Sequence, residues 1–216
     1  IIQTRSKPKG EGGMKENPIR DLLAQGNWGE DQALLQGLRQ WQYAPVLWQA
    51  YETLQEEALF HSQVHGPGHI HRVLLLAALL CWKEGAPEEM VRQVFRAASY
   101  HDVGRTFDGY DIYHGARSAL RLAALTGQTG EALVELQAAV TAHSRPDREM
   151  ASIVASFQPR DLPHAMALTR LLKDADNLDR VRLGDLDPKF LRHDSAKDLV
   201  GFAQRLFQRD QAAREP

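Results

Sequence analysis

The chain has 216 residues, of which 43% are hydrophobic and 25% are charged. This length and composition are typical of a single globular domain with a hydrophobic core. The formal net charge of -2 gives no overall basic field for nucleic acid, although a local basic patch stays open. No stretch approaches the roughly 18 consecutive apolar residues of a membrane span. The single cysteine, Cys81, lies in an apolar run and predicts a buried core residue in a reducing, cytoplasmic protein without disulfides.

Residues 1–16 are expected to form a flexible lead-in, because they contain a Lys-Pro-Lys-Gly-Glu-Gly-Gly run and no signal-peptide core. Met14 is a candidate natural start. Residues 17–216 are then expected to form the whole domain. Helical periodicity dominates this region and strand-like alternation is almost absent, which predicts an all-α fold. In chain order, helices are predicted at 17–25, 30–41, 45–60, 69–83, 87–100, 114–126, 131–143, 148–157, 163–182 and 195–211.

The N-terminal part of the chain, with the early predicted helices, carries three tryptophans, Trp28, Trp41 and Trp48. Large aromatic side chains either fill a core or cover an interface. We expect core packing, with a homodimer surface as the alternative.

The predicted helix 69–83 follows a Gly-Pro-Gly turn and is apolar on nearly every face. A helix of this kind is usually buried on all sides. We therefore expect it to lie at the centre of the domain, and the Gly-Ala-Pro run at 85–87 to end it.

Several polar residues continue the apolar stripes of these helices. His69 shares a helix face with core leucines, His143 lies in the same way on helix 131–143, and Asp176 follows Leu172 by one turn. The pair His101-Asp102 ends the apolar helix before it. One such residue alone is more often a hydrogen-bonded core residue. Several of them from different helices predict a shared metal ion, because burying polar groups together without a partner is costly.

The donor types indicate the kind of metal site. Imidazole and carboxylate ligands suit one or two divalent ions of Mn, Fe, Ni, Co, Zn or Mg. The cysteine pairs of a structural zinc knot are absent from the sequence. A catalytic centre, with positions left for water and substrate, is therefore expected.

Three local motifs, in this order, resemble the signature of the HD superfamily of metal-dependent phosphohydrolases. His69-Ile-His-Arg-Val73 resembles the first-histidine motif, and His101-Asp102-Val-Gly-Arg resembles the motif that names the family. Asp174-Ala-Asp176-Asn-Leu-Asp179 resembles the last motif, whose second aspartate is a ligand. The resemblance covers residues 61–182. It implies a single all-helical bundle with the site among about five core helices.

The resemblance also implies the ligand set. His69, His101, Asp102 and Asp176 would hold one ion. His114, which begins an H-x-x-x-S-A run, and His143 would hold a second ion, bridged by Asp102. Two alternatives stay open for His114 and His143: they bind substrate phosphate at a single-metal site, or they are surface residues at helix ends.

The implied reaction is hydrolysis of a phosphate ester of a nucleotide or a similar small phosphorylated metabolite. The sequence Ser-Arg-Pro after His143 differs from the G-Y-P motif of relatives that cleave cyclic dinucleotides. Guanidinium groups bind phosphate through paired hydrogen bonds, so basic residues beside the motifs are candidates for holding it. The expected catalytic residues are Asp102, Arg105, Lys173 and Asp179, the last as a residue that orients a ligand. The expected substrate-binding residues are His65, Arg72 and Arg145, with a structural salt bridge as the alternative for Arg72.

The loop after the His-Asp pair offers Asp108 and Asp111 as acid or base. The remaining histidines lie outside the motif positions: His61 and His71 are interpreted as structural, and His164 and His193 as solvent-facing. Three other functions compete with hydrolysis, of which a helical interaction protein leaves the clustered ligands unexplained. A di-iron oxygenase would use the same fold and the His114–His143 pair, and a non-catalytic nucleotide-binding regulatory module would keep the fold alone. Intact metal motifs argue against the module.

Overall fold

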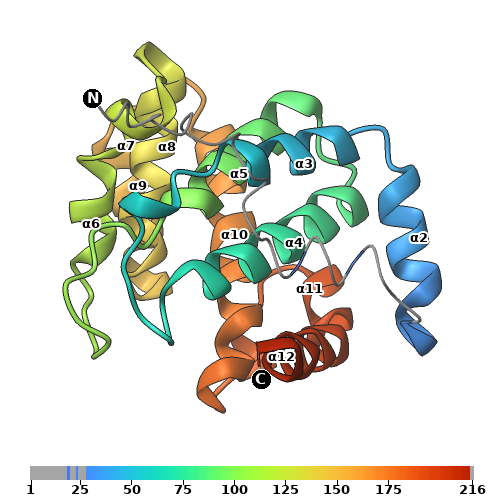
Figure 1. Cartoon of the computed structure of the whole chain (residues 1–216). Helices are drawn as coiled ribbons and strands as arrows, with labels where there is room; N and C mark the ends of the chain where they lie inside the picture. The colour runs from blue at the N-terminus through green and yellow to red at the C-terminus, as the bar shows by residue number, and fades with distance from the viewer. Residues whose placement is uncertain (1–18, 20–22, 24–27, 215–216) are drawn as a thin grey trace, which may run out of the picture.

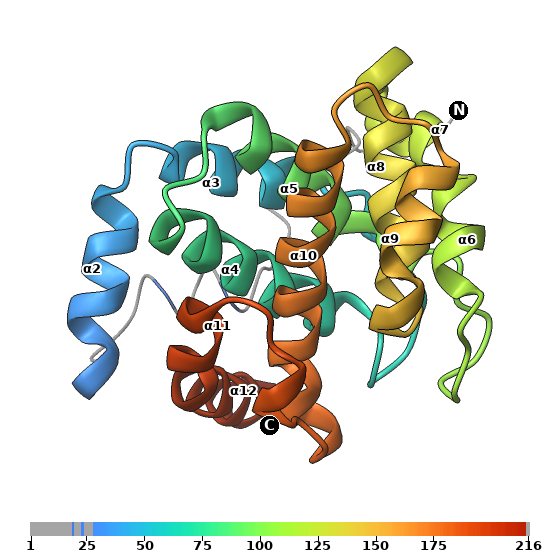
Figure 2. The same ribbon diagram turned by 180° about the vertical axis from the view of Figure 1, so that it is seen from behind.

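The computed structural model describes residues 19, 23 and 28–214, and within them the fold is all-α, without a strand (Figures 1 and 2). This confirms the predicted fold class. The α-helices are α2 (Gln32–Gln40), α3 (Ala44–Thr53), α4 (Pro67–Lys83), α5 (Glu88–Tyr100), α6 (His114–Ala119), α7 (Leu122–Thr126), α8 (Gly130–His143), α9 (Asp147–Ser156), α10 (Leu162–Leu178), α11 (Asp194–Asp198) and α12 (Val200–Arg214). Short 3-10 helices are η1 (Gly29–Asp31), η2 (Glu56–Ala58), η3 (Asp179–Leu183) and η4 (Pro188–Phe190).

Helix α4 is the centre of the domain, as its sequence predicts. It is buried continuously from His69 to Cys81, and it packs against α5 and α10. Cys81 is fully buried, and burial raises the pKa of its thiol, so it is a core residue and not a reactive one. Five of its 17 residues are leucines, all fully buried, and the removal of their side chains from water stabilises the fold.

Helix α10 joins two groups of helices. On one side α10 packs against α8, which also packs against α6, α7 and α9. On the other side α10 packs against α4 and α5 (Figure 2). Helices α11 and α12 pack against α4 (Figure 1). Ser195 of α11 contacts Glu84 at the C-terminal end of α4, and Asp210 of α12 contacts Arg72 near its N-terminal end, next to η3. Because α4, α5, α6, α8 and α10 meet in the middle, a residue near the end of each one points into a common interior.

Helix boundaries differ from the predictions where tertiary hydrogen bonds compete with the helix. The helix predicted over 45–60 ends at Thr53, and the amide of Gln55 donates to the hydroxyl of Tyr100 at 3.2 Å instead. The helix predicted over 114–126 is interrupted after Ala119, whose carbonyl accepts a bond of 3.1 Å from Gln137 Nε2. The helix predicted over 163–182 changes to η3 after Leu178, and the last predicted helix is divided into α11 and α12.

The N-terminal region packs against the core. Trp28 is 2% exposed and stacks on Phe202 of α12 with ring centroids 6.3 Å apart, and Trp41 and Trp48 pack against the buried cluster. Trp28 is therefore a core residue, whereas Trp41 and Trp48 stay partly exposed. Of the predicted helix 17–25, only Ile19 and Leu23 are described, both helical and buried, and the predicted lead-in 1–16 lies outside the described residues. Among the described helices, none has the length and apolar character needed to span a membrane.

Candidate metal centre

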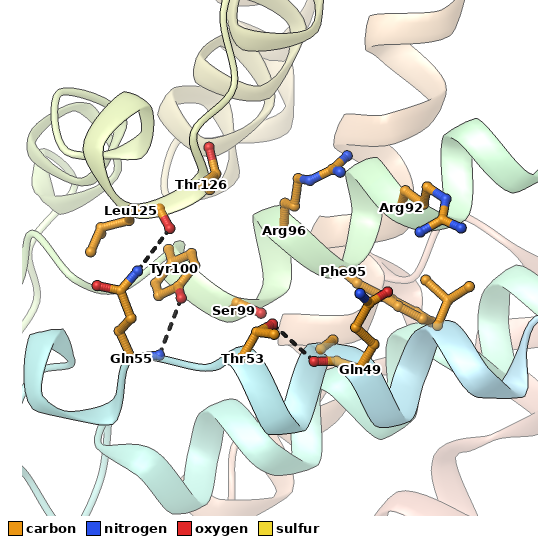
Figure 3. A pocket seen from close by; sticks show the side chains of 12 residues that line it. Gln49, Thr53, Gln55, Arg92, Phe95, Arg96, Ser99, Tyr100, Leu125 and Thr126 are labelled. Atoms are coloured by element: carbon orange, nitrogen blue, oxygen red, sulfur yellow. Dashed lines mark hydrogen bonds between the residues drawn. The ribbon is translucent and has the colours of Figure 1, made fainter.

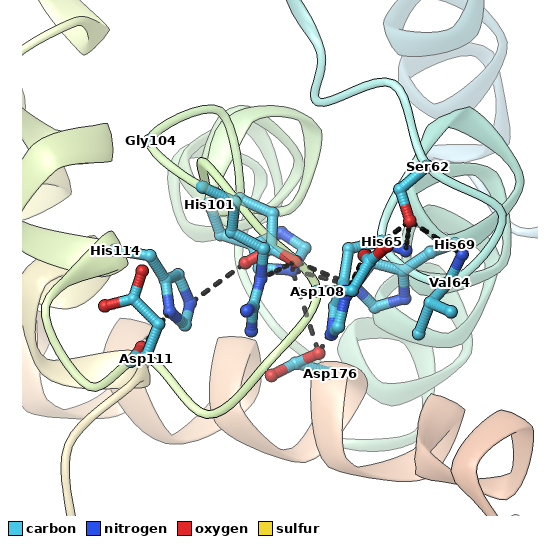
Figure 4. Close-up of polar contacts among 12 residues, drawn as sticks. Ser62, Val64, His65, His69, His101, Gly104, Asp108, Asp111, His114 and Asp176 are labelled. Atoms are coloured by element: carbon cyan, nitrogen blue, oxygen red, sulfur yellow. Dashed lines mark hydrogen bonds and ion pairs between the residues drawn. The ribbon is translucent and has the colours of Figure 1, made fainter.

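The side chains predicted as metal ligands come together in the interior, where the core helices meet. His69 lies on α4, His101 and Asp102 directly follow α5, and His114 and His143 lie on α6 and α8. All of these are buried. Asp176 on α10 is the most exposed of the set, with 23% of its side chain accessible. Figure 4 shows the rings of His69, His101 and His114 directed toward one another, with Asp176 reaching toward them from α10.

The ligand atoms form overlapping groups rather than one loose cluster. Within each group the donor atoms lie within 4.8 Å of one another, a spacing that one ion would satisfy. Asp102 lies between the two ends of the array: its Oδ2 is 3.6 Å from His69 Nε2, and its Oδ1 is 2.9 Å from His114 Nε2. The groups are His69–His101–Asp102, His101–His143–Asp176 and Asp102–His114–His143.

The second nitrogen of every ring determines which nitrogen faces the interior. Each Nδ1 lies against an oxygen that only accepts hydrogen bonds, so Nδ1 carries the ring proton. Nε2 is then unprotonated in a neutral ring, and its lone pair is free to bind a metal ion. The Nδ1 partners are Ala98 O for His101 at 2.9 Å, Val140 O for His143 at 2.5 Å, Asp111 O for His114, and Asp179 Oδ2 for His69 at 2.7 Å.

The Nε2 atoms then face one another at short distance. His69 Nε2 and His101 Nε2 are 3.1 Å apart, and His114 Nε2 and His143 Nε2 are 2.9 Å apart. Two unprotonated nitrogens at this distance repel unless a cation lies between or beside them. The buried Oδ1 of Asp102 also lacks a hydrogen-bond partner among the described residues. These donors therefore fit divalent metal ions, which would satisfy all of these atoms.

The electrostatics agree with ligands ready to bind a cation. Burial, together with the charge of Arg182, lowers the pKa of His69 to about 3, and burial lowers that of His143 to about 4, so both rings are neutral at pH 7. Burial alone would raise the pKa of Asp102, but the neighbouring His101 and His114 hold it well below its usual range. Although burial lowers it, the neighbouring Asp102 and Asp176 together raise the pKa of His101. The centre thus presents the neutral rings of His69 and His143 and an ionised carboxylate, the forms that bind metal.

A buried ion-pair network holds His69 from behind. Asp179 accepts from the His69 ring and from Arg72, whose Nε and Nη2 lie 2.7 and 3.0 Å from its oxygens. Arg72 also donates to Asp210 of α12, which is 0% exposed. The predicted substrate-binding role of Arg72 is therefore wrong, because its guanidinium is buried in this network and does not line the cleft. Asp179 has the orienting contact expected of it.

Lys173 supports the end of α8. Its Nζ donates to the carbonyls of His143 at 3.1 Å and Arg145 at 2.6 Å, and it lies 3.2 Å from Asp147. Cations stabilise the carbonyl end of a helix in this way. This arrangement favours a supporting role for Lys173, in place of the catalytic role predicted for it, although its side chain borders the cleft.

An open cleft of about 900 Å³ leads from the surface to His114, His143 and Asp176. Besides these ligands and Lys173, three more predicted site residues line it. Arg105 Nε donates to Asp102 Oδ2 at 2.9 Å, His65 Nδ1 lies 2.9 Å from Asp108, and Arg145 lies over the ring of Tyr113 at 5.1 Å. Arg105, His65 and Arg145 are therefore placed where a molecule in the cleft would meet them.

The structure also shows residues that the sequence did not indicate. Asp174 is buried and accepts from the backbone and ring of His193, at 2.9 and 2.7 Å, and from Arg192. The solvent-facing prediction for His193 is thus wrong, and the only sequence signal was the Asp-x-Asp spacing that makes Asp174 part of a motif. His164 is likewise only partly exposed, 3.7 Å from Glu135.

The other residues named from the sequence have simpler environments. His71 is buried and bonds Glu56 at 3.1 Å, which confirms its structural interpretation, whereas His61 is exposed. Asp111 pairs with Arg117, while Asp108 has 47% of its side chain accessible at the cleft. Tyr110, Asn177 and Arg180 also line the cleft and were not predicted.

Comparison with known proteins agrees with these observations. The family model described as HD domain matches residues 68–181, which include every residue of the metal-ligand array. No curated protein matches the chain, and no solved structure matches it.

Proposed function

Because the chain belongs to the HD domain family, we propose that it is a metal-dependent phosphohydrolase acting on a phosphate ester of a nucleotide or a similar small phosphorylated metabolite. The observation that carries the proposal is the array of buried Nε2 and carboxylate oxygen atoms, open on one side to a cleft lined by arginines. A purely structural metal would not need such a cleft.

In this proposal His69, His101, Asp102 and Asp176 would hold one divalent ion, and Asp102, His114 and His143 a second. When bound, such ions lower the pKa of water and neutralise charge that builds on phosphoryl oxygens. The protein supplies fixed donors: the hydrogen bonds to Nδ1 prevent ring rotation, so the lone pairs stay aimed at the interior.

Arg105 and Arg145 would bind the phosphate from the walls of the cleft. Arg105 is held by Asp102, which places its guanidinium beside the ligand array. Arg145 is held from below by Glu149, at 2.6 Å, and from above by the ring of Tyr113. A guanidinium fixed in this way loses little freedom when it binds an oxyanion, so it contributes more to affinity.

His65 is the residue best placed to move a proton. Its Nδ1 donates to Asp108, so its Nε2 is unprotonated and able to accept a proton at the cleft. Burial lowers the pKa of His65, and bonds from Ser62 and His65 lower that of Asp108, so the pair is a neutral ring held by an ionised carboxylate.

A di-iron oxygenase remains the second candidate, and the close His114–His143 pair favours it, because a second metal position is available. The two functions differ in the required metal and co-substrate. Oxygen consumption that depends on iron would support the oxygenase, whereas phosphate release without oxygen would support the hydrolase.

The proposal is tested by assaying phosphate release from a panel of phosphorylated nucleotides with Mn, Fe, Ni, Co, Zn or Mg added. We expect activity that Asp102→Ala abolishes while its circular dichroism stays helical. Asp198→Ala, which removes an exposed aspartate on α11, is the matched control and should keep full activity. Full activity in Asp102→Ala would contradict the proposal.

A further inference from the structure

A second cavity lies between α3, α5 and the end of α7, apart from the metal centre (Figure 3). Its volume is about 340 Å³, and among the described residues none lines both this cavity and the cleft. Small-molecule sites typically measure about 300–1,000 Å³. The cavity is therefore large enough for a small metabolite.

Two arginines, one helical turn apart on α5, line this cavity. Arg92 pairs with Glu88, whose Oε1 lies 3.0 and 2.6 Å from its Nε and Nη2. Arg96, in contrast, makes no hydrogen bond or ion pair with any other residue in the part of the chain that is described. Like charges at this helical spacing repel.

The surroundings of Arg96 make this charge unfavourable without a partner. The side chain is partly buried, and burial together with the charge of Arg92 lowers its pKa, which Glu89 offsets only in part. A partly desolvated guanidinium beside a like charge is stabilised by any anion that reaches it. Arg96 on α5 is thus a cation without a directly bonded anionic partner among the described residues.

Hydroxyl groups and rings complete the wall. Ser99 is 4% exposed, and its hydroxyl bonds no other residue among those described. Thr53 Oγ1 donates to the carbonyl of Gln49 at 2.9 Å, so its oxygen is still able to accept. Figure 3 shows both hydroxyls facing the space between α3 and α5, with the ring of Tyr100 beside them. Polar contacts at one end and an aromatic surface near them are typical of a site for an organic molecule.

We propose that this cavity binds a small organic anion, whose phosphate or carboxylate group pairs with the Arg96 guanidinium and whose polar part bonds Ser99 and Thr53. Phosphate and carboxylate share the oxygen geometry that a guanidinium binds through two hydrogen bonds. Arg96 and Ser99 precede His101 on one helix, so the anion would contact the helix that ends at the metal centre.

The site is tested by NMR titration of the full chain with inorganic phosphate and, separately, with acetate. We expect saturable shifts of the Arg96 side-chain Nε–Hε signal and the Ser99 amide. Arg96→Gln should raise the Kd for the anion at this cavity at least tenfold. Arg160→Gln is the control with the same charge change, because Arg160 is 88% exposed and lines neither cavity.

The anion that saturates the Ser99 signal at the lower concentration identifies phosphate or carboxylate as the preferred group. Arg96→Gln should fold, because it removes a repulsion, and Arg96→Lys should bind with intermediate affinity, because it keeps the charge and loses the paired hydrogen bonds. The proposal is overturned if neither anion gives saturable shifts at Arg96 and Ser99, or if Arg96→Gln binds with unchanged Kd.

Discussion

The two ends of the ligand array are held in place by different kinds of contact. On the α4 side, His69 is fixed by Asp179, which is fixed by Arg72 and through it by Asp210 of α12. On the α8 side, His114 and His143 are fixed by backbone carbonyls three residues earlier in the chain. The ring of His69 is therefore oriented by distant side chains, whereas the rings of His114 and His143 are oriented by carbonyls close in the sequence. Mutations of Arg72 or Asp210 should disturb only the α4 side.

The largest effect is expected for Asp179→Asn. Asp179 is 1% exposed and pairs with Arg72, which is 3% exposed, so the change leaves a buried guanidinium with half of its charge compensation. Loss of one partner of a buried pair costs about 3–5 kcal/mol. Urea unfolding should show this loss in the free energy of unfolding, and Asp198→Asn should show no change. A loss below about 1 kcal/mol would mean that the network does not support the α4 side.

Asp210→Asn tests how far this support extends. Asp210 accepts from Arg72 and from Arg214, and it has no contact with the ligands themselves. Removing a residue that orients a ligand typically lowers metal affinity 10- to 100-fold. We expect about a tenfold loss for one ion and none for the other, measured by calorimetric titration. Equal loss at both ions would contradict the division into two sides.

His143→Ala probes the α8 side. The change removes a ligand of the proposed second ion, and the bond it breaks inside the protein is to a carbonyl within the same helix. We expect the number of bound ions to fall from two to one, while the free energy of unfolding of the metal-free protein changes by about 1 kcal/mol. Elemental analysis and urea unfolding measure the two quantities. Loss of both ions would show that the two positions are not independent.

The smallest effect concerns pH. The hydrogen bond to Asp174 raises the pKa of His193 and, with Arg192, holds that of Asp174 below its usual value despite burial. Because the folded pKa of His193 exceeds its unfolded value of about 6.5, its contribution is complete below pH 6.5 and is lost as the pH rises through the folded pKa. Unfolding between pH 5 and 9 should show this decline in the native chain and not in His193→Asn. We expect less than about 1 kcal/mol, because the pair is partly exposed.

The apolar stripes of single helices indicate His69, His143 and Asp176, and the structure brings these three residues together with His101 and Asp102. His114 was expected only from the resemblance to the family signature. Arg72 shows where this reasoning ends. It lies beside a motif, but its partner Asp210 is 138 residues away, and no local spacing reveals that pair. The same holds for His193, which bonds Asp174, because no local spacing reveals that contact. The sequence pattern predicts a helix that continues past Thr53. The observed helix ends there because the end is determined by tertiary hydrogen bonds, which a pattern in the linear sequence does not contain.

The central claim is that Asp102 joins two metal positions. Elemental analysis of the chain after incubation with Mn and removal of free ion tests it most directly. We expect two ions per chain in the native protein and none in Asp102→Ala, with helical content unchanged. Equal metal content in the native protein and Asp102→Ala, or a native protein that retains no divalent ion, would contradict the account.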